Sequence, residues 1–342
     1  MSLFRRFAES APASAGRPAV GRRARTALPP AFQGPLDVPL SKIVSQRAGL
    51  ADRDARPAGA DADLAAENPG PAPDLSPSRP VPVVLVHGTL DNAISSWHSL
   101  APLLSNAGFS VFTVNVGRVP SNELAGGLGP VADSAAELAA RVEQVRTFTG
   151  SEVVDLVGHS QGGVVAHEFI RHQGGAEVVR TVVGLGVPNG AVSPTGAKIL
   201  RTLIGGKVPA LDDLLPGSDF QRRLAETGVV DPTVNYTMIG TRFDEAVLPH
   251  SSLYLPETSG TEGTDNSITN VRLQDRHRLD AADHFALPYD PCALVEVVRA
   301  LDPSVAEDPD WDIPTTLVLP YNGGAVAAFA RPKTSQATDA GV

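Results

Sequence analysis

Cysteine is almost missing from this chain of 342 residues, which contains only Cys292. A single thiol cannot form an intrachain disulfide, and it cannot supply a metal site built from several cysteines. Cys292 begins an apolar stretch near the end of the chain, so we expect a small buried side chain in a helix.

Long apolar runs and an excess of basic residues are also missing. No segment approaches the roughly 18 consecutive apolar residues of a membrane-spanning helix, and we predict no transmembrane segment. The formal net charge of −10 argues against nucleic acid as a partner and favours a neutral or apolar substrate. Arg5 and Arg6 are not followed by the apolar stretch of a secretion signal, so both an extracellular and a cytoplasmic location stay open.

Composition divides the chain into three parts. Residues 1–80 hold twelve of the thirty prolines and show no sustained hydrophobic period, which predicts an irregular extension. Residues 81–302 are predicted to form the folded domain, and residues 303–342 a C-terminal extension rich in proline and aspartate. Residues 190–230 are expected to form a small helical cap over the site, which we expect to move at lipid–water interfaces; alternatively, they are ordinary helices that complete the core.

Short apolar runs alternate with helical patterns in residues 81–302. The runs predict strands near residues 83–86, 108–114, 153–157, 179–184, 234–239 and 269–273. Helical patterns occupy residues 96–104, 131–148, 163–170 and 293–301. This alternation predicts an α/β fold with a mostly parallel central sheet and helices on both faces.

The most informative motif is Gly158-His159-Ser160-Gln161-Gly162. It joins a predicted buried strand to a predicted helix, which is the context of a nucleophile elbow. Glycines at both ends have no Cβ and permit the sharp turn that exposes the serine. We predict that Ser160 is a nucleophile; the alternative is a glycine-rich turn without chemistry.

A serine hydroxyl is a weak nucleophile, so it needs a base and an acid that orients the base. Among eight histidines, His284 lies in a loop just before the last predicted helix, and it follows serine and acid in the chain order typical of this elbow. Asp244, a few residues after a predicted strand, is our choice for the acid, and Glu245 is the alternative. Asp283 is expected to support the histidine loop.

Other residues near the motif are assigned supporting roles. His87 and His159 are expected to support turns, and His159 is expected to point away from the chemistry. The oxyanion formed during ester cleavage needs N–H donors. We predict the backbone N–H of Gln161, which follows the nucleophile, and that of Thr89, with Leu90 as the alternative.

Several segments together resemble the actinobacterial-type triacylglycerol lipases of the α/β-hydrolase superfamily. The resemblance covers roughly residues 82–301, and its segments are residues 82–89, 127–130, 157–163, 239–245 and the pair Asp283-His284. It implies hydrolysis of acylglycerol esters by Ser160, Asp244 and His284, without a metal or another cofactor. Members of this family are usually secreted and often contain disulfides. This chain has His277 at a position where many members have a cysteine. Residues 1–80 have no counterpart in the family.

The leading hypothesis is therefore a lipase or esterase that cleaves fatty acyl esters through an acyl-enzyme. Its expected partners are a lipid or ester substrate and a lipid interface. Acyl transfer to an alcohol by the same three residues is an alternative. A second alternative is a non-catalytic binding module with the same fold.

Overall fold

The computed structural model describes residues 57, 60, 75, 76, 79–122, 124–190, 193, 198, 202, 208–256 and 267–304. The two predicted extensions lie almost entirely outside the described residues, as do most of residues 191–207.

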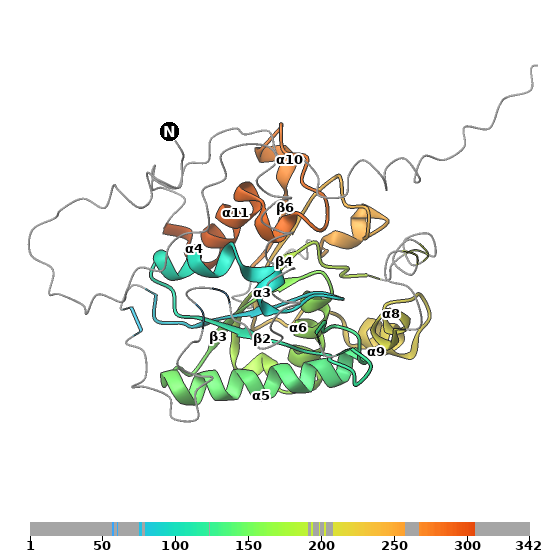
Figure 1. Cartoon of the computed structure of the whole chain (residues 1–342), viewed down its shortest axis with the longest axis horizontal. Helices are drawn as coiled ribbons and strands as arrows, with labels where there is room; N and C mark the ends of the chain where they lie inside the picture. The colour runs from blue at the N-terminus through green and yellow to red at the C-terminus, as the bar shows by residue number, and fades with distance from the viewer. Residues whose placement is uncertain are drawn as a thin grey trace, which may run out of the picture.

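Strands and helices alternate along the described chain (Figure 1). The strands are β1 (Val83–Val86), β2 (Val111–Val114), β3 (Val154–His159), β4 (Val179–Leu185), β5 (Asn235–Gly240) and β6 (Ile268–Arg272). The helices are α3 (Ala93–Trp97), α4 (Leu100–Asn106), α5 (Val131–Thr149), α6 (Gln161–His172), α8 (Pro209–Asp213), α9 (Asp219–Thr227), α10 (Leu273–Arg276) and α11 (Pro291–Leu301), with 3-10 turns η1 (Gly175–Glu177), η2 (His250–Leu253) and η3 (Leu287–Tyr289). None of the described helices has both the length and the apolar character needed to cross a membrane.

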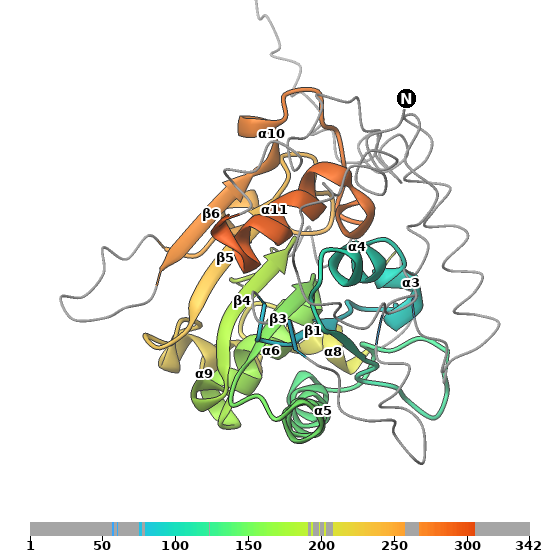
Figure 2. The ribbon, with the colours of Figure 1, turned by 90° about the vertical axis from the view of Figure 1, so that its left-hand side faces the viewer.

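All six strands form one parallel sheet in the order β2-β1-β3-β4-β5-β6. Figure 2 shows the twisted sheet, with β6 at one end and β1 and β3 side by side. Because the strands are parallel, the loops that follow β1, β3 and β5 leave the sheet at the same edge. The α/β prediction is confirmed.

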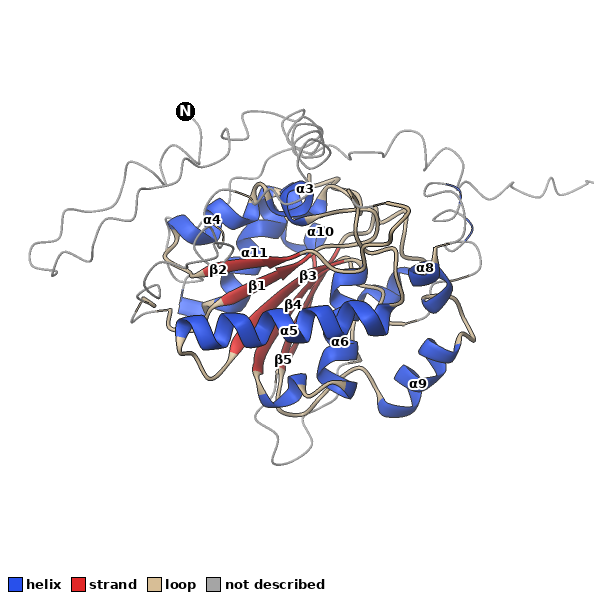
Figure 3. Ribbon diagram, turned by 60° about the horizontal axis from the view of Figure 1, so that its bottom comes forward, coloured by secondary structure: helices blue, strands red, loops and turns tan. Residues whose placement is uncertain are grey.

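Two apolar layers pack on opposite faces of the sheet (Figure 3). Successive strand side chains point to opposite faces. Val84 and Val86 of β1 therefore lie in the core cluster that contains α5 and α6, whereas Val83 and Leu85 lie in the cluster that contains α4 and α11. Burial on both faces explains why β1 is a continuous apolar run in the sequence.

The described part of the predicted cap packs into the core. Apolar side chains of α8 and α9, among them Leu211, Phe220 and Leu224, belong to the same buried cluster as α5 and α6. Asp213 also accepts a hydrogen bond from the Val131 backbone N–H at 2.8 Å, which supplies the first turn of α5 with a carboxylate. These two helices fit the alternative of ordinary core helices, and the rest of the predicted cap lies outside the described residues.

Candidate active site

Ser160 lies in a strained turn between β3 and α6. Its φ of 52° and ψ of −124° are unusual for a residue with a side chain, and strain of this kind persists only where the surroundings enforce it. Here the Ser160 N–H donates to Leu185 O at 2.9 Å, and its carbonyl accepts from Gly163 N at 3.0 Å. These bonds fix the turn from both sides.

The two glycines of the motif allow the close approach that this turn requires. A Cβ on Gly162 would lie 2.2 Å from the carbonyl oxygen of Val86, and a Cβ on Gly158 would lie 2.6 Å from the nitrogen of Gly163. Both contacts are with backbone, which cannot move aside easily. The turn around Ser160 is therefore pressed against strand β1 and against the start of its own helix.

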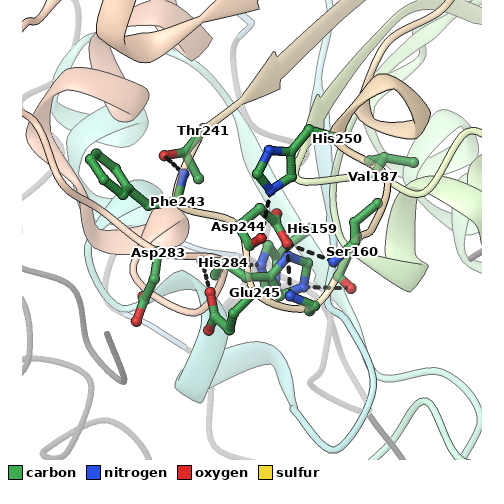
Figure 4. Close-up of polar contacts among 12 residues, drawn as sticks. His159, Ser160, Val187, Thr241, Phe243, Asp244, Glu245, His250, Asp283 and His284 are labelled. Atoms are coloured by element: carbon green, nitrogen blue, oxygen red, sulfur yellow. Dashed lines mark hydrogen bonds and ion pairs between the residues drawn. The ribbon is translucent and has the colours of Figure 1, made fainter. Parts of the chain in front are cut away.

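The structure brings Ser160, His284 and Asp244 together from three separate loops (Figure 4). His284 Nε2 lies 2.9 Å from Ser160 Oγ, and its Nδ1 lies 2.7 Å from Asp244 Oδ2. The histidine and the aspartate are each 2% exposed. Only the tautomer with the proton on Nδ1 can donate to Asp244 and accept from Ser160 at the same time.

Asp244 is fixed through its other oxygen. Its Oδ1 accepts from the backbone N–H groups of Ala246 at 3.0 Å and Val247 at 2.7 Å. Its carbonyl oxygen accepts from His250 Nε2 at 2.8 Å. The carboxylate therefore presents only Oδ2 to His284, in a fixed direction.

The charge environment of His284 favours its protonated form. Burial by itself lowers the pKa of the imidazole, but the carboxyl groups of Asp244, Glu245 and Asp283 together outweigh this effect, with the largest contribution from Asp244. The pKa of His284 is therefore raised above its ordinary value. A base of this kind holds a transferred proton well once it has accepted it.

The loop after β1 faces the N-terminus of α6. Thr89 Oγ1 donates to Gln161 Oε1 at 2.5 Å. Neither the Thr89 nor the Gln161 backbone N–H donates to an acceptor within the described part of the chain. The Leu90 N–H instead donates to Gly126 O at 3.0 Å, and Leu90 has a φ of 58°. The Leu90 N–H, the alternative donor, is therefore already used to hold the loop.

His87 and His159 have different roles in the structure. His87 Nδ1 donates to Gly88 O at 2.8 Å, and its Nε2 accepts from Val116 N at 3.1 Å, so it holds the loop after β1 as expected. His159 does not point away from the site: its Nε2 donates to His284 O at 3.0 Å, and the two rings lie 5.0 Å apart. Its position beside Ser160 was the only signal in the sequence for this contact.

One group of buried side chains has the composition of a metal site. The ligand atoms of Asp280, Asp290 and Cys292 lie within 4.8 Å of one another. However, both Asp290 carboxylate oxygens accept backbone N–H groups at the start of α11, where the positive end of the helix dipole disfavours a cation. Burial also raises the pKa of the Cys292 thiol far above its ordinary value, so it is a poor thiolate ligand.

Comparison with known proteins gives partial matches. Residues 82–228 match the family of palmitoyl protein thioesterases, a stretch that includes Ser160 and ends before Asp244. A triacylglycerol lipase from Burkholderia plantarii is 29% identical over 131 residues, which are 37% of this chain and 34% of that protein. A triacylglycerol lipase from Pseudarthrobacter phenanthrenivorans is 30% identical over 113 residues, 32% of this chain and 33% of that protein. The matched segments thus span about a third of each relative's length.

Among solved structures, lipase B of Aspergillus fumigatus superposes with a TM-score of 0.54 at 21% sequence identity, and the match covers 78% of this chain and 65% of that one. The chain therefore has a lipase-like α/β-hydrolase fold.

Proposed function

We propose that this chain is a serine-dependent carboxylic ester hydrolase that cleaves fatty acyl esters through an acyl-enzyme intermediate. The observation that carries the proposal is the unbroken hydrogen-bonded series from Ser160 Oγ through His284 to Asp244, with contacts of 2.9 and 2.7 Å. An alcohol, an imidazole and a carboxylate in this order are the groups that activate a serine for attack on a carbonyl carbon. The similarity to lipases over part of the chain supports acylglycerols as the substrate class.

In the proposed acylation step, Ser160 Oγ attacks the ester carbonyl carbon while His284 Nε2 takes its proton. The resulting imidazolium is stabilised by the Asp244 carboxylate, which receives the Nδ1–H bond. His284 then donates the proton from Nε2 to the departing alkoxide, and the alcohol leaves. In deacylation a water molecule attacks the acyl-enzyme, and His284 acts first as base and then as acid in the same way.

The negative oxygen formed in each step needs preset donors. We assign this role to the backbone N–H groups of Thr89 and Gln161, which have no acceptor among the described residues. A donor of this kind is typically worth about 2.7–4 kcal/mol in the transition state. The Thr89 side chain, bonded to Gln161 at 2.5 Å, holds the two donor segments together.

Hydrolysis of acyl thioesters is a second candidate, favoured by the match of residues 82–228 to palmitoyl protein thioesterases. The same acyl-enzyme would form, with a thiolate in place of the alkoxide as the leaving group. Acyl transfer to an alcohol would also use the same three residues. A non-catalytic binding module would have no need of the three aligned side chains.

The test compares the full chain with its Ser160→Ala variant on p-nitrophenyl esters, triacylglycerols of increasing chain length and palmitoyl-coenzyme A. We expect Ser160→Ala to lower kcat by about 10^6-fold and to abolish labelling by a fluorophosphonate probe. Ser251→Ala, which changes an exposed serine of η2, is the matched control and keeps full activity. Turnover by Ser160→Ala at the wild-type rate would contradict the proposal.

The same assay separates the candidates. A higher kcat/KM on palmitoyl-coenzyme A than on esters would favour the thioesterase, and ester products formed with an added alcohol would favour acyl transfer. Absence of both turnover and labelling in the wild-type chain would favour the binding module.

A further inference from the structure

Glu245, which follows Asp244 in the chain, touches the opposite end of His284. Its Oε2 accepts the backbone N–H of His284 at 3.0 Å, while the imidazole of His284 is bonded to Asp244. The loop after β5 therefore holds His284 by its main chain and by its ring, with two adjacent carboxyl groups. The mechanism proposed above uses only one of them.

The second oxygen of Glu245, Oε1, is buried and has no hydrogen-bond partner among the described residues. Asp283 lies beside Glu245 (Figure 4), and its Oδ1 accepts from Ala286 N at 3.0 Å. It costs free energy to bury an ionised carboxylate when one of its oxygens has no hydrogen bond and another carboxylate lies beside it. A protonated carboxyl group is uncharged and costs less at such a place.

The charged and titratable groups around this cluster come from three segments. Asp244 and Glu245 belong to the loop after β5, and Asp283 and His284 to the loop before η3. His159, from the end of β3, contacts His284 O. Two further groups lie nearby: the His250 ring, at the start of η2, is bonded to the Asp244 carbonyl, and the Arg242 guanidinium, in the loop after β5, lies 4.8 Å from the centre of the Phe243 ring. Three carboxyl groups thus surround one imidazole.

Glu245 and His284 titrate as a linked pair. Burial, and next the repulsion of Asp283, raise the pKa of Glu245 to about 8, and the pKa of His284 is raised as well. When the pair has lost one proton, it exists either as neutral imidazole with protonated Glu245 or as imidazolium with ionised Glu245. Only the first form can accept the proton of Ser160.

We propose that Glu245 is a proton-bearing positioning residue, which holds the His284 main chain and competes with the imidazole for one shared proton. This inference rests on the proposed function of Ser160 and His284. A fraction of the enzyme is in the imidazolium form, which is inactive, so the acid limb of the activity profile lies at higher pH than it would without Glu245. A residue at position 245 that does not titrate should therefore shift the acid limb to lower pH.

The experiment measures the rate of fluorophosphonate labelling of the full chain against pH, from about pH 5 to about pH 9. Glu245→Gln can still accept the His284 N–H but carries no titratable proton, and we expect its acid limb to move to lower pH by about 0.5 unit or more. Glu245→Ala loses the acceptor as well, and its plateau rate falls by about 10-fold below that of Glu245→Gln. Glu226→Gln, on the exposed face of α9, leaves the limb in place.

Two results would overturn the inference. One is an acid limb in Glu245→Gln that coincides with the wild-type limb. The other is an equal loss of rate in Glu245→Gln and Glu245→Ala at every pH, which is the result for a merely structural role.

A second measurement separates this inference from the proposed function. If the wild-type chain is not labelled at any pH, the proposed function fails, and NMR titration of the His284 ring in wild type and Glu245→Gln still decides the linkage. A lower imidazole pKa in Glu245→Gln supports the shared proton, and equal values contradict it.

Discussion

Steric contact holds the turn around Ser160, whereas buried polar contacts hold the loop around His284. A Cβ on Gly162 would come within 2.2 Å of backbone, so the turn can take only one shape. The histidine loop is instead tied by carboxyl groups: Glu245 binds the His284 N–H, Asp283 binds Ala286 N, and Glu296 binds His277. The first region depends on small residues close in sequence, and the second on polar contacts, two of which join residues 39 and 19 positions apart.

Because of this difference, different kinds of substitution should disrupt the two regions. Added volume damages the turn at any pH, because a steric clash does not titrate. Loss or gain of a proton changes the histidine loop, because its contacts are ionic or hydrogen-bonded. The following substitutions test this contrast, from the largest expected effect to the smallest.

Asp244→Asn should have the largest effect of these substitutions, and this effect is on activity. An amide at this position favours the tautomer of His284 with the proton on Nε2, which cannot accept from Ser160. We expect kcat/KM on a p-nitrophenyl ester to fall by about 10^3 to 10^4, with a small change in thermal stability.

Asp219→Asn, on the exposed surface of α9, is the control for the loss of a carboxylate. Activity of Asp244→Asn within tenfold of wild type would contradict the assignment and would favour Glu245 as the acid.

Gly162→Ala should have the largest effect on stability. The new Cβ would contact Val86 O at 2.2 Å and His87 O at 2.7 Å, and the backbone of β1 cannot give way. We expect a loss of about 3 kcal/mol in the free energy of unfolding, measured by urea denaturation at several pH values, with the same loss at each.

Gly129→Ala is the matched control, because Gly129 is also buried and its Cβ would have no neighbour closer than 3.6 Å. Equal stability of the two variants would show that the turn is not sterically fixed.

Glu296→Gln should give a smaller, pH-dependent loss in the second region. Glu296 on α11 accepts from Arg276 at 2.5 Å and contacts His277 at 3.4 Å. Burial alone raises the pKa of Glu296, but His277, Arg276 and Arg299 outweigh it and lower the pKa overall. We expect a loss of about 2 kcal/mol at neutral pH.

The sign of the pH dependence follows from the lowered pKa. The ionised form of Glu296 is favoured in the folded state. Its contribution to the free energy of unfolding is therefore complete above the pKa of about 4.3 in the unfolded chain, and it disappears as the pH falls through the pKa of Glu296 in the folded protein. Stability curves of wild type and Glu296→Gln should therefore converge in acid, while Glu226→Gln should follow wild type throughout. A stability difference between wild type and Glu296→Gln that is the same at all pH values would contradict an ionic origin of the Glu296 contribution.

Asp290→Asn should give the smallest change in stability, which is a gain relative to wild type as the pH rises. Burial and the adjacent Asp280 raise the pKa of Asp290 well above its usual range, so the wild-type protein loses stability as the pH rises above the unfolded value. The amide does not titrate, and its NH2 group can face Asp280 in place of the proton that the raised pKa of Asp290 retains, although one of the two backbone N–H contacts of Asp290 is lost. We expect the stability of the variant relative to wild type to increase by about 1 kcal/mol between pH 5 and pH 8.

Asp275→Asn, an exposed carboxylate of α10, controls for the loss of charge in Asp290→Asn. A stability difference between Asp290→Asn and wild type that does not grow between pH 5 and pH 8 would contradict the expected linkage.

The sequence predicted the fold better than the details of the site. All six predicted strands lie within a few residues of those observed. The inner strands are buried on both faces, which favours apolar runs in the sequence, whereas the edge strand β6 is only partly buried and only partly apolar. The single predicted helix at residues 96–104 is two helices, α3 and α4. The first begins earlier than predicted, because Asn92 caps it through Ser95 N. The location of α8 and α9 could not be predicted, because an amphipathic face does not indicate what it packs against.

Features read directly along the chain determined three things: the alternation of apolar runs and helical patterns determined the sheet, glycine spacing the sharp turn at Ser160, and chain order the choice of Asp244 and His284 as its predicted partners. Only the tertiary structure decided which groups around them are already engaged: the Leu90 N–H bonded to Gly126, the His159 ring against His284, and the Glu245 carboxyl on the histidine main chain. The last two contacts join residues separated by 125 and 39 positions. Their existence depends on which loops meet at the edge of the folded sheet, and no spacing along the chain specifies that meeting.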